Sequence, residues 1–234
     1  MAVGVSADLS RFDEALAWFL SRVILTDDEL DDLNARARMQ AWWFSGGEQL
    51  RLVQDVFDDL ARALNLGLPF SDFKKQVSAK LASAWGGANP HRVETIWINA
   101  MQRAYGGGRY RQLTTPTMKR FRPFWMYDAV LDSRTSPMCK ERDSKVLSAD
   151  DPWWDSNYPP LHHRCRSGVR ALTKRQAAQR GITTTPDFAE GPQDGFGASP
   201  KNDMGSTVKP NLAKFDNELA ADLRRRAERA GVAA

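Results

Sequence analysis

Apolar residues in the first half of the chain recur at intervals of three and four positions, which is the spacing of one helical face. The first run of this kind is Leu9, Phe12, Leu16, Phe19, Leu20 and Val23. After it, Thr26-Asp27-Asp28-Glu29 has the form of a capping box, and Leu30, Leu33 and Met39 continue an apolar stripe. The pattern therefore predicts helices on both sides of Thr26.

Three further helices are predicted before residue 105, and the first two lie between Gly46 and Leu81. After the break at Ser45-Gly46-Gly47, an apolar stripe runs up to Gly67, which is expected to end the helix as its C-cap. The members of this stripe are Leu50, Val53, Phe57, Leu60 and Leu64. Ser71 is expected to cap a short helix that carries Phe73, Val77 and Leu81.

The third of these helices is expected to start at Asn89-Pro90, a favourable pair for the N-cap and the first helical position. Its apolar residues are Val93, Ile96, Trp97, Ala100, Met101 and Ala104. Gly106-Gly107-Gly108 is interpreted as a helix break or hinge, since it lacks the Lys-Ser/Thr of a phosphate-binding P-loop. The first half of the chain is thus predicted to be an α-helical bundle.

The pattern changes after Pro116. Phe124–Leu131 is aromatic and β-branched, and with Lys145–Leu147 and Ser167–Leu172 it predicts a small antiparallel sheet. The segment from Ser148 to Pro160 is rich in turn-forming residues and is expected to be a long functional loop. Thr173 is expected to start a short helix.

The last part of the chain is expected to be an extended arm followed by an amphipathic helix. Gly, Pro, Ser and Asp dominate from Thr183 to Lys209, and Leu212, Phe215, Leu219 and Leu223 then share one helical side. Such an arm and helix suit docking into the groove of a partner. The fold class is therefore α+β, with a helical domain at 1–115, a small β-module at 116–182, and an arm with a terminal helix at 183–234.

Charge and composition exclude some classes of protein. The chain has 234 residues and a net charge of +4, which is only mildly basic and weak support for nucleic-acid binding. We expect no membrane association, because no apolar run approaches the roughly 18 residues that a spanning helix needs. The N-terminus does not resemble a secretory signal, so the chain is expected to be made in the cytoplasm.

Both cysteines and two of the three histidines fall in two short motifs, Asp132–Cys139 and Pro159–Arg166. Zinc favours thiolate and imidazole ligands, so Cys139, His162 and Cys165 could supply three ligands, and His163, Asp143 or water the fourth. Two small buried cysteines with satisfied histidines are an alternative. A disulfide is the third reading, although a reducing cytosol argues against it.

Two further groups of polar residues have candidate roles. Asp132, Arg134 and Thr135 could form a structural motif, in which an Asp132–Arg134 ion pair fixes the turn after the first strand of the sheet. Basic residues interleaved with aromatic ones could contact DNA phosphates, although a solvated basic face explains them equally well. These residues are Arg103, Arg109, Arg111, Lys119, Arg120 and Arg122.

Several unusual segments, in this order and with these gaps, resemble the phage Mu F-like minor head protein family over about residues 43–200. They include Phe121–Trp125, Asp132–Thr135, Tyr158–His162 and Gly195–Pro200. Many members of that family continue the last cysteine motif as Cys-Arg-Cys, whereas this chain has Cys165-Arg166-Ser167. If the family site binds zinc, the fourth partner in this chain is expected to be weaker.

The resemblance implies a minor capsid protein of a tailed bacteriophage rather than an enzyme. It further implies a place inside the virion head near the portal vertex, and a role in head assembly, genome packaging or DNA ejection. The portal protein, the major capsid protein and double-stranded DNA are the partners that it suggests.

Two alternatives come from other classes of protein. A metal-dependent HNH-like nuclease would use His162 or His163 as general base and Asp155 or Asp143 to hold a divalent ion. The helix after the sheet, Lys174–Gln179, offers no further ligands for such a site. A free double-stranded-DNA-binding protein is the other alternative, and its affinity would fall steeply with salt.

Overall fold

The computed structural model describes residues 12–26, 28–30, 41–184, 186, 188, 190–201 and 217–230. It confirms the α+β class, with helices on either side of a three-stranded antiparallel sheet. The described chain forms two compact units, and each is considered by itself. Unit 1 contains residues 12–26, 28–30, 41–108 and 217–230, and unit 2 contains residues 109–201. No helix in these residues is both long and apolar enough to cross a membrane.

Unit 1 is built mainly from helices, as the periodicity predicts, and also contains two very short strands. The first predicted run is helical only as far as Leu20, because Val23 begins a strand that pairs in parallel with a second one. Glu29 accepts a hydrogen bond from the Thr26 amide at 2.7 Å, which is half of the expected capping box. The elements are α1 (Asp13–Leu20), β1 (Val23–Ile24), the 3₁₀ helix η2 (Asp28–Leu30), β2 (Ala41–Trp42), α3 (Leu50–Leu66), α4 (Phe70–Ala84), the first part of α5 (Pro90–Thr114) and α11 (Asn217–Arg229).

The helix ends of unit 1 follow local capping chemistry. Gly67 adopts the left-handed conformation after α3, with φ of 67°, which confirms it as the C-cap. Asn89 Oδ1 accepts a hydrogen bond from the Arg92 amide at 3.0 Å, so the predicted N-cap of α5 is also confirmed. The prediction for Ser71 is wrong, because α4 already begins at Phe70 and Pro69 is its N-cap.

The predicted helix break at Gly106-Gly107-Gly108 is wrong, because α5 continues through all three glycines to Thr114. Their small size has a packing role instead. A Cβ atom on Gly107 would lie 2.2 Å from the Trp18 ring, and one on Gly108 would lie 2.4 Å from the Ala15 backbone nitrogen. The glycines therefore allow α1 to approach the α5 backbone more closely than any side chain would permit.

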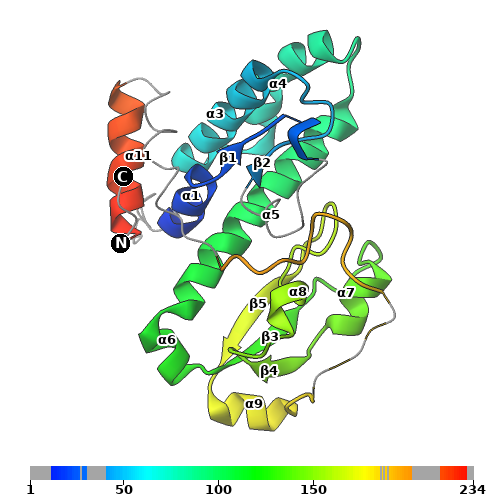
Figure 1. Ribbon diagram of the computed structural model, residues 1–234, viewed down its shortest axis with the longest axis vertical. Coiled ribbons are helices and arrows are strands. Elements are labelled where there is room, and N and C mark those ends of the chain that lie inside the picture. Colours follow the sequence, from blue (N-terminus) through cyan, green and yellow to red (C-terminus); the bar gives the residue numbers. More distant parts are fainter. Residues whose placement is uncertain are drawn as a thin grey trace, which may run out of the picture. The chain divides into compact units, whose positions relative to one another are not determined.

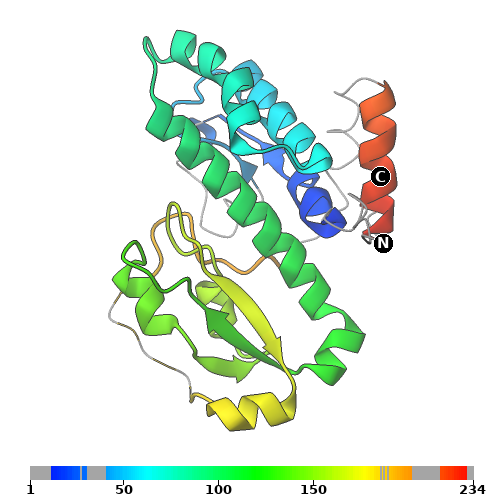
Figure 2. The ribbon, with the colours of Figure 1, turned by 180° about the vertical axis from the view of Figure 1, so that it is seen from behind.

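Helix α11 packs against α1 in unit 1, and both views show the two helices side by side (Figures 1 and 2). Its Leu223 and Ala227 are fully buried. Of the predicted apolar side, Leu223 is therefore covered by its own chain, and docking of the arm and helix into a partner stays a prediction. The predicted apolar residues Leu212 and Phe215, and the side chain of Leu219, lie outside the described residues.

A buried arginine anchors α11 to the rest of unit 1. The Arg226 side chain is fully buried and donates from Nε to Asp13 Oδ1 at 2.5 Å. Its Nη1 donates to the backbone oxygen and to Oδ1 of Asn65, both at 2.7 Å. Asn65 Nδ2 in turn donates to Asp222 at 2.7 Å. This network joins α1, the end of α3 and α11.

Unit 2 contains the predicted sheet, in the order β4-β3-β5 with both pairings antiparallel. In the register of the sheet, Trp125 lies opposite Leu147 on one side and Ala171 on the other. The capping box at Thr173 starts the predicted helix after the sheet. The elements after α5 are α6 (Pro116–Phe121), β3 (Phe124–Asp128), α7 (Pro137–Arg142), β4 (Val146–Ser148), α8 (Trp154–Asn157), β5 (Gly168–Leu172) and α9 (Lys174–Arg180).

Alternate residues of β3 point to opposite faces of this sheet, and different helices cover the two faces. Met126 packs with Val146 and Leu172 on the face covered by Ala177 of α9. Trp125 and Tyr127 point to the other face, which α8 covers; this helix lies in front of the strands in Figure 1 and behind them in Figure 2. The larger core on this face contains Cys139 and Cys165, so it also positions the candidate site.

Candidate functional site

The two cysteine motifs meet beside the larger core of unit 2. Ser136 caps α7 by accepting a hydrogen bond from the Cys139 amide at 3.2 Å, and Pro137 occupies the first turn. This cap fixes Cys139 in the first turn of the helix. The second motif follows a loop that places His162 and Cys165 on one tight turn, closed by a hydrogen bond from the Cys165 amide to the His162 oxygen.

The ligand atoms of Cys139, His162 and Cys165 all lie within 4.8 Å of one another. The Cys139 sulfur is 3.2 Å from His162 Nε2 and 3.7 Å from the Cys165 sulfur. Both cysteines are buried free thiols, and His162 is half-buried. The structure thus brings together the three residues that the sequence motifs single out.

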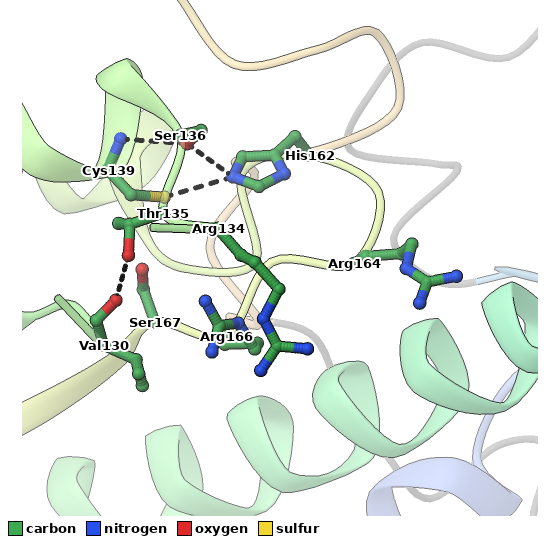
Figure 3. A pocket seen from close by; sticks show the side chains of 9 residues that line it. All are labelled: Val130, Arg134, Thr135, Ser136, Cys139, His162, Arg164, Arg166 and Ser167. Atoms are coloured by element: carbon green, nitrogen blue, oxygen red, sulfur yellow. Dashed lines mark hydrogen bonds between the residues drawn. The ribbon is translucent and has the colours of Figure 1, made fainter. Parts of the chain in front are cut away.

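Hydrogen bonds hold the imidazole of His162 in one orientation. Its Nδ1 lies 2.8 Å from the backbone oxygen of His163, and its Nε2 lies 2.8 Å from Ser136 Oγ. Because a carbonyl oxygen only accepts, Nδ1 carries a proton and Nε2 faces the sulfur atoms. Figure 3 shows the Ser136 hydroxyl, the Cys139 sulfur and the His162 ring converging in this way.

The thiols and the imidazole change one another's acidity. The hydrogen bond with Cys165 has the largest effect on Cys139 and lowers its pKa, and the bond to His162 acts in the same direction. The same bond between the cysteines raises the pKa of Cys165, which burial raises further. The hydrogen bond to Cys139 raises the pKa of His162. The hydrogen bonds of the cluster therefore lower the pKa of Cys139 and raise that of His162.

Tyr127 and Ser167 complete the surroundings of the cluster, and neither was singled out from the sequence as a partner of the thiols. The Tyr127 hydroxyl lies 3.2 Å from the Cys139 sulfur, and burial raises the pKa of this tyrosine well above its usual range. Ser167 hydrogen-bonds to Cys139 and helps to lower the pKa of that thiol. Ser167 is almost fully buried, so its hydroxyl lies against the sulfur rather than in bulk solvent.

Asp132 pairs with the predicted Arg134 and, more closely, with Arg166 of the second motif. Arg166 donates to both carboxylate oxygens of Asp132, at 2.7 and 2.5 Å, whereas Arg134 Nη2 is 3.9 Å away. The expected Asp132–Arg134 ion pair is thus present but longer, and the Arg134 amide also donates to Asp132 Oδ1 at 2.9 Å. The bonds from Arg166, followed by the one from the Arg134 amide, lower the pKa of Asp132 far below its usual value.

Thr135 closes the same turn, as expected for a structural motif. Its hydroxyl accepts a hydrogen bond from the Asp132 amide at 2.9 Å and donates to the Val130 backbone oxygen. The side chains of this turn and of the second motif line a small pocket beside the cluster. Its lining consists of Val130, Arg134, Thr135, Ser136, Cys139, His162, Arg164, Arg166 and Ser167 (Figure 3).

The two residues considered as a fourth ligand are held elsewhere. The Asp143 carboxylate accepts hydrogen bonds from the Ala129 amide and the Ser144 hydroxyl, both at 2.8 Å. The His163 ring packs edge-on against Phe196, with ring centroids 4.8 Å apart. Neither residue belongs to the cluster of potential ligands among the described residues.

The beginning of the predicted arm lies against the loop that carries His162. The Gln193 amide donates to the Leu161 oxygen at 2.9 Å, and the Gly197 amide donates to the Pro160 oxygen at 3.1 Å. Phe196 is buried, and Gly197 has φ of 80° with Pro192 too close to allow a side chain. The described residues from 190 to 201 are therefore part of the packing of unit 2.

The six basic residues that were predicted to contact DNA are divided between the two units, and several of them have other contacts. Burial lowers the pKa of Arg103, in unit 1, to about 10. In unit 2, Lys119 pairs with Asp150 at 2.5 Å, and Arg122 donates to the Ala171 oxygen at 3.1 Å. Arg120 is exposed and lies over the Phe121 ring, while Arg109 and Arg111 are half-buried on α5. The phosphate-binding role of this set stays a prediction.

The fold and the site together define an α+β protein with a thiol–imidazole cluster beside a small antiparallel sheet. Comparison with known families matches residues 54–170 to the phage Mu protein F like family, and the chain belongs to that family. The matched segment includes Cys139, His162 and Cys165.

Two curated relatives are similar to this chain. One is "Putative capsid assembly protein F" of Escherichia phage Mu, which is 24% identical over 221 residues, covering 87% of this chain and 50% of the relative. The other is "Mu-like prophage FluMu F protein" of Haemophilus influenzae, which is 29% identical over 130 residues, covering 56% of this chain and 31% of the relative. The chain thus spans at most half the length of these relatives. No solved structure matches it.

Proposed function

We propose that the chain is a minor capsid protein of a tailed bacteriophage, located inside the head near the portal and acting in head assembly, genome packaging or DNA ejection. The observation that carries this proposal is the family membership over residues 54–170, together with the similarity to the capsid assembly protein F of phage Mu. The proposed role is structural rather than enzymatic. Its proposed partners are the portal protein, the major capsid protein and double-stranded DNA.

The structure favours this role over that of a metal-dependent nuclease. Nucleases that use hard divalent cations need oxygen ligands, and carboxylates are the usual ones. Here Asp155 pairs with Lys201, and Asp143 accepts hydrogen bonds from the Ala129 amide and the Ser144 hydroxyl. Within the described part of the chain, the metal-ligand cluster contains two thiols and an imidazole and no carboxylate. Such a donor set suits a soft metal better than a phosphodiester-cleaving centre.

The test is quantitative mass spectrometry of gradient-purified particles of the phage that encodes this chain. The particles are treated with nuclease and washed with salt, and the chain is quantified against the portal and major capsid proteins. A head protein stays with the particles at a constant, low ratio to the portal. A free DNA-binding protein is lost in the wash, because its phosphate contacts are screened and displaced by salt.

Two further measurements test the position and the role. Cross-linking in intact particles should connect the chain to the portal protein, and particles made without the chain should be defective in head yield, DNA content or infectivity. Absence of the chain from washed particles would overturn the proposal. Metal-dependent cleavage of DNA by the purified chain would instead support the nuclease alternative.

A further inference from the structure

The spacing of the two sulfur atoms matches that of two ligands on one zinc ion. With Zn–S bonds of about 2.3 Å at a tetrahedral angle, two thiolates lie about 3.8 Å apart. The Cys139 and Cys165 sulfurs are 3.7 Å apart, which is far longer than a disulfide bond of about 2.05 Å. The His162 Nε2 atom is 3.2 Å from the Cys139 sulfur, and the ligand atoms of all three residues lie within 4.8 Å of one another.

The hydrogen bonding of His162 prepares it as a ligand. In metal sites a histidine usually donates its second ring N–H to a carbonyl or carboxylate, which fixes the tautomer and the ring orientation. Nδ1 of His162 makes this contact with the backbone oxygen of His163, at 2.8 Å. The lone pair of Nε2 then becomes available toward the two sulfur atoms once its own proton is displaced.

The Cys165 sulfur also makes hydrogen bonds with the backbone. These contacts involve the backbone at Leu161 and at Ser167. They arise from the same turn that carries His162, which makes the two ligands one local unit.

The residues around the three ligand atoms limit the choice of a fourth ligand. Asp143 and His163 are engaged elsewhere, whereas Ser136 and Ser167 lie next to the sulfur and nitrogen atoms. The pocket lined by Arg134, Arg164 and these serines lies beside the cluster. A metal at this position would take a water molecule from the pocket, or a serine hydroxyl, as its fourth ligand.

We propose that Cys139 Sγ, His162 Nε2 and Cys165 Sγ bind one zinc ion, with the fourth position completed by water or by the Ser167 hydroxyl. Two thiolates and an imidazole in tetrahedral arrangement select zinc over magnesium or calcium. The ion links the start of α7 to the turn before β5, two segments separated by 26 residues in the chain. Because metal ligands must be deprotonated, binding releases any protons held on the two sulfurs and on Nε2.

The first test measures metal in the full chain, purified under reducing conditions without chelators and without a histidine tag. Elemental analysis should find about one zinc per chain. Replacement by Co²⁺ should give the sulfur-to-cobalt charge-transfer band and the strong d–d absorption of a tetrahedral thiolate site. Cys139→Ser, Cys165→Ser and His162→Gln should each lose the zinc, whereas His163→Gln should keep it, because its ring packs on Phe196.

A second test keeps the proposal falsifiable if the ligand variants fold poorly. Ser167→Cys adds a thiolate next to the ion, and competition with a chelator should show zinc binding tighter by about tenfold or more. In the wild-type chain, iodoacetamide should alkylate Cys139 slowly with zinc bound and rapidly after chelation.

Three results would overturn the zinc assignment. The first is a wild-type chain with two reduced thiols that binds neither zinc nor cobalt. The second is zinc retained by all three ligand variants. The third is alkylation of Cys139 at the same rate with and without chelator, which would identify the cluster as a simple thiol–imidazole pair.

Discussion

Replacing Asp13 with alanine tests the buried arginine network of unit 1. Asp13 accepts hydrogen bonds from Arg226, whose side chain is fully buried, and from Arg229, whose side chain is 56% exposed. Removing one member of a buried ion pair costs about 3–5 kcal/mol, because the other charge is left uncompensated. Arg226 keeps its bonds to Asn65, so we expect Asp13→Ala to lose about 3 kcal/mol, near the lower limit.

The matched control removes the other partner of the same carboxylate. Arg229→Ala breaks an exposed pair and should cost at most about 1 kcal/mol. Both variants are measured by urea unfolding, followed by tryptophan fluorescence and circular dichroism. Because two units need not unfold together, hydrogen exchange of peptides from α1 and α11 assigns the loss to unit 1. Equal effects of Asp13→Ala and Arg229→Ala would refute the reasoning.

Three further predictions concern pH, packing and the turn beside the candidate site. Burial alone would raise the pKa of Asp13, but Arg229 and Arg226 together lower it below its usual 3.8. The stability that the Asp13 carboxylate contributes is therefore present at neutral pH and is lost as the pH falls below about 4. Acid unfolding monitored by circular dichroism should show this loss in the wild-type chain and not in Asp13→Ala. Gly107→Ala should destabilise unit 1 by about 1–3 kcal/mol in urea unfolding, because the new Cβ meets the Trp18 ring. The control Gly87→Ala should be nearly neutral, because a Cβ at Gly87 has none of the neighbouring atoms within 4 Å. Asp132→Ala should accelerate exchange of the Arg134 amide, measured by NMR, since that amide loses its acceptor; unchanged exchange would show that the rest of the turn holds it.

The sequence predicts the elements of this protein best where the information is local. The caps at Asn89 and Gly67 and the strands β3 to β5 follow from short patterns of residues, and the structure confirms them. The parallel pair of β1 and β2 was not predicted, because strands of two residues are too short to show a period. The glycines of α5 were misread because a glycine run that serves close helix packing looks the same in sequence as one that breaks a helix.

The candidate site shows the same division between local and distant information. Both motifs are local, so Cys139, His162 and Cys165 could be identified from residue type and spacing. The closer partner of Asp132 could not, because Arg166 lies 34 residues away, whereas the predicted Arg134 is a neighbour in the sequence. Ser136 is a residue that local reasoning could have found, since Ser136-Pro137 is a typical start of a helix.

The anchoring of α11 sets the order in which the chain can acquire its structure during synthesis. Asp13 and Arg226 are separated by 213 residues, so at about 5–20 residues per second the ribosome needs roughly 10–40 s to make the second after the first. Unit 2 draws its described residues from one continuous segment that is complete before α11 is made. The sheet and its cysteine cluster can therefore form while α1 still lacks its cover, and during that interval the uncovered surface of unit 1 is exposed to chaperones and to aggregation.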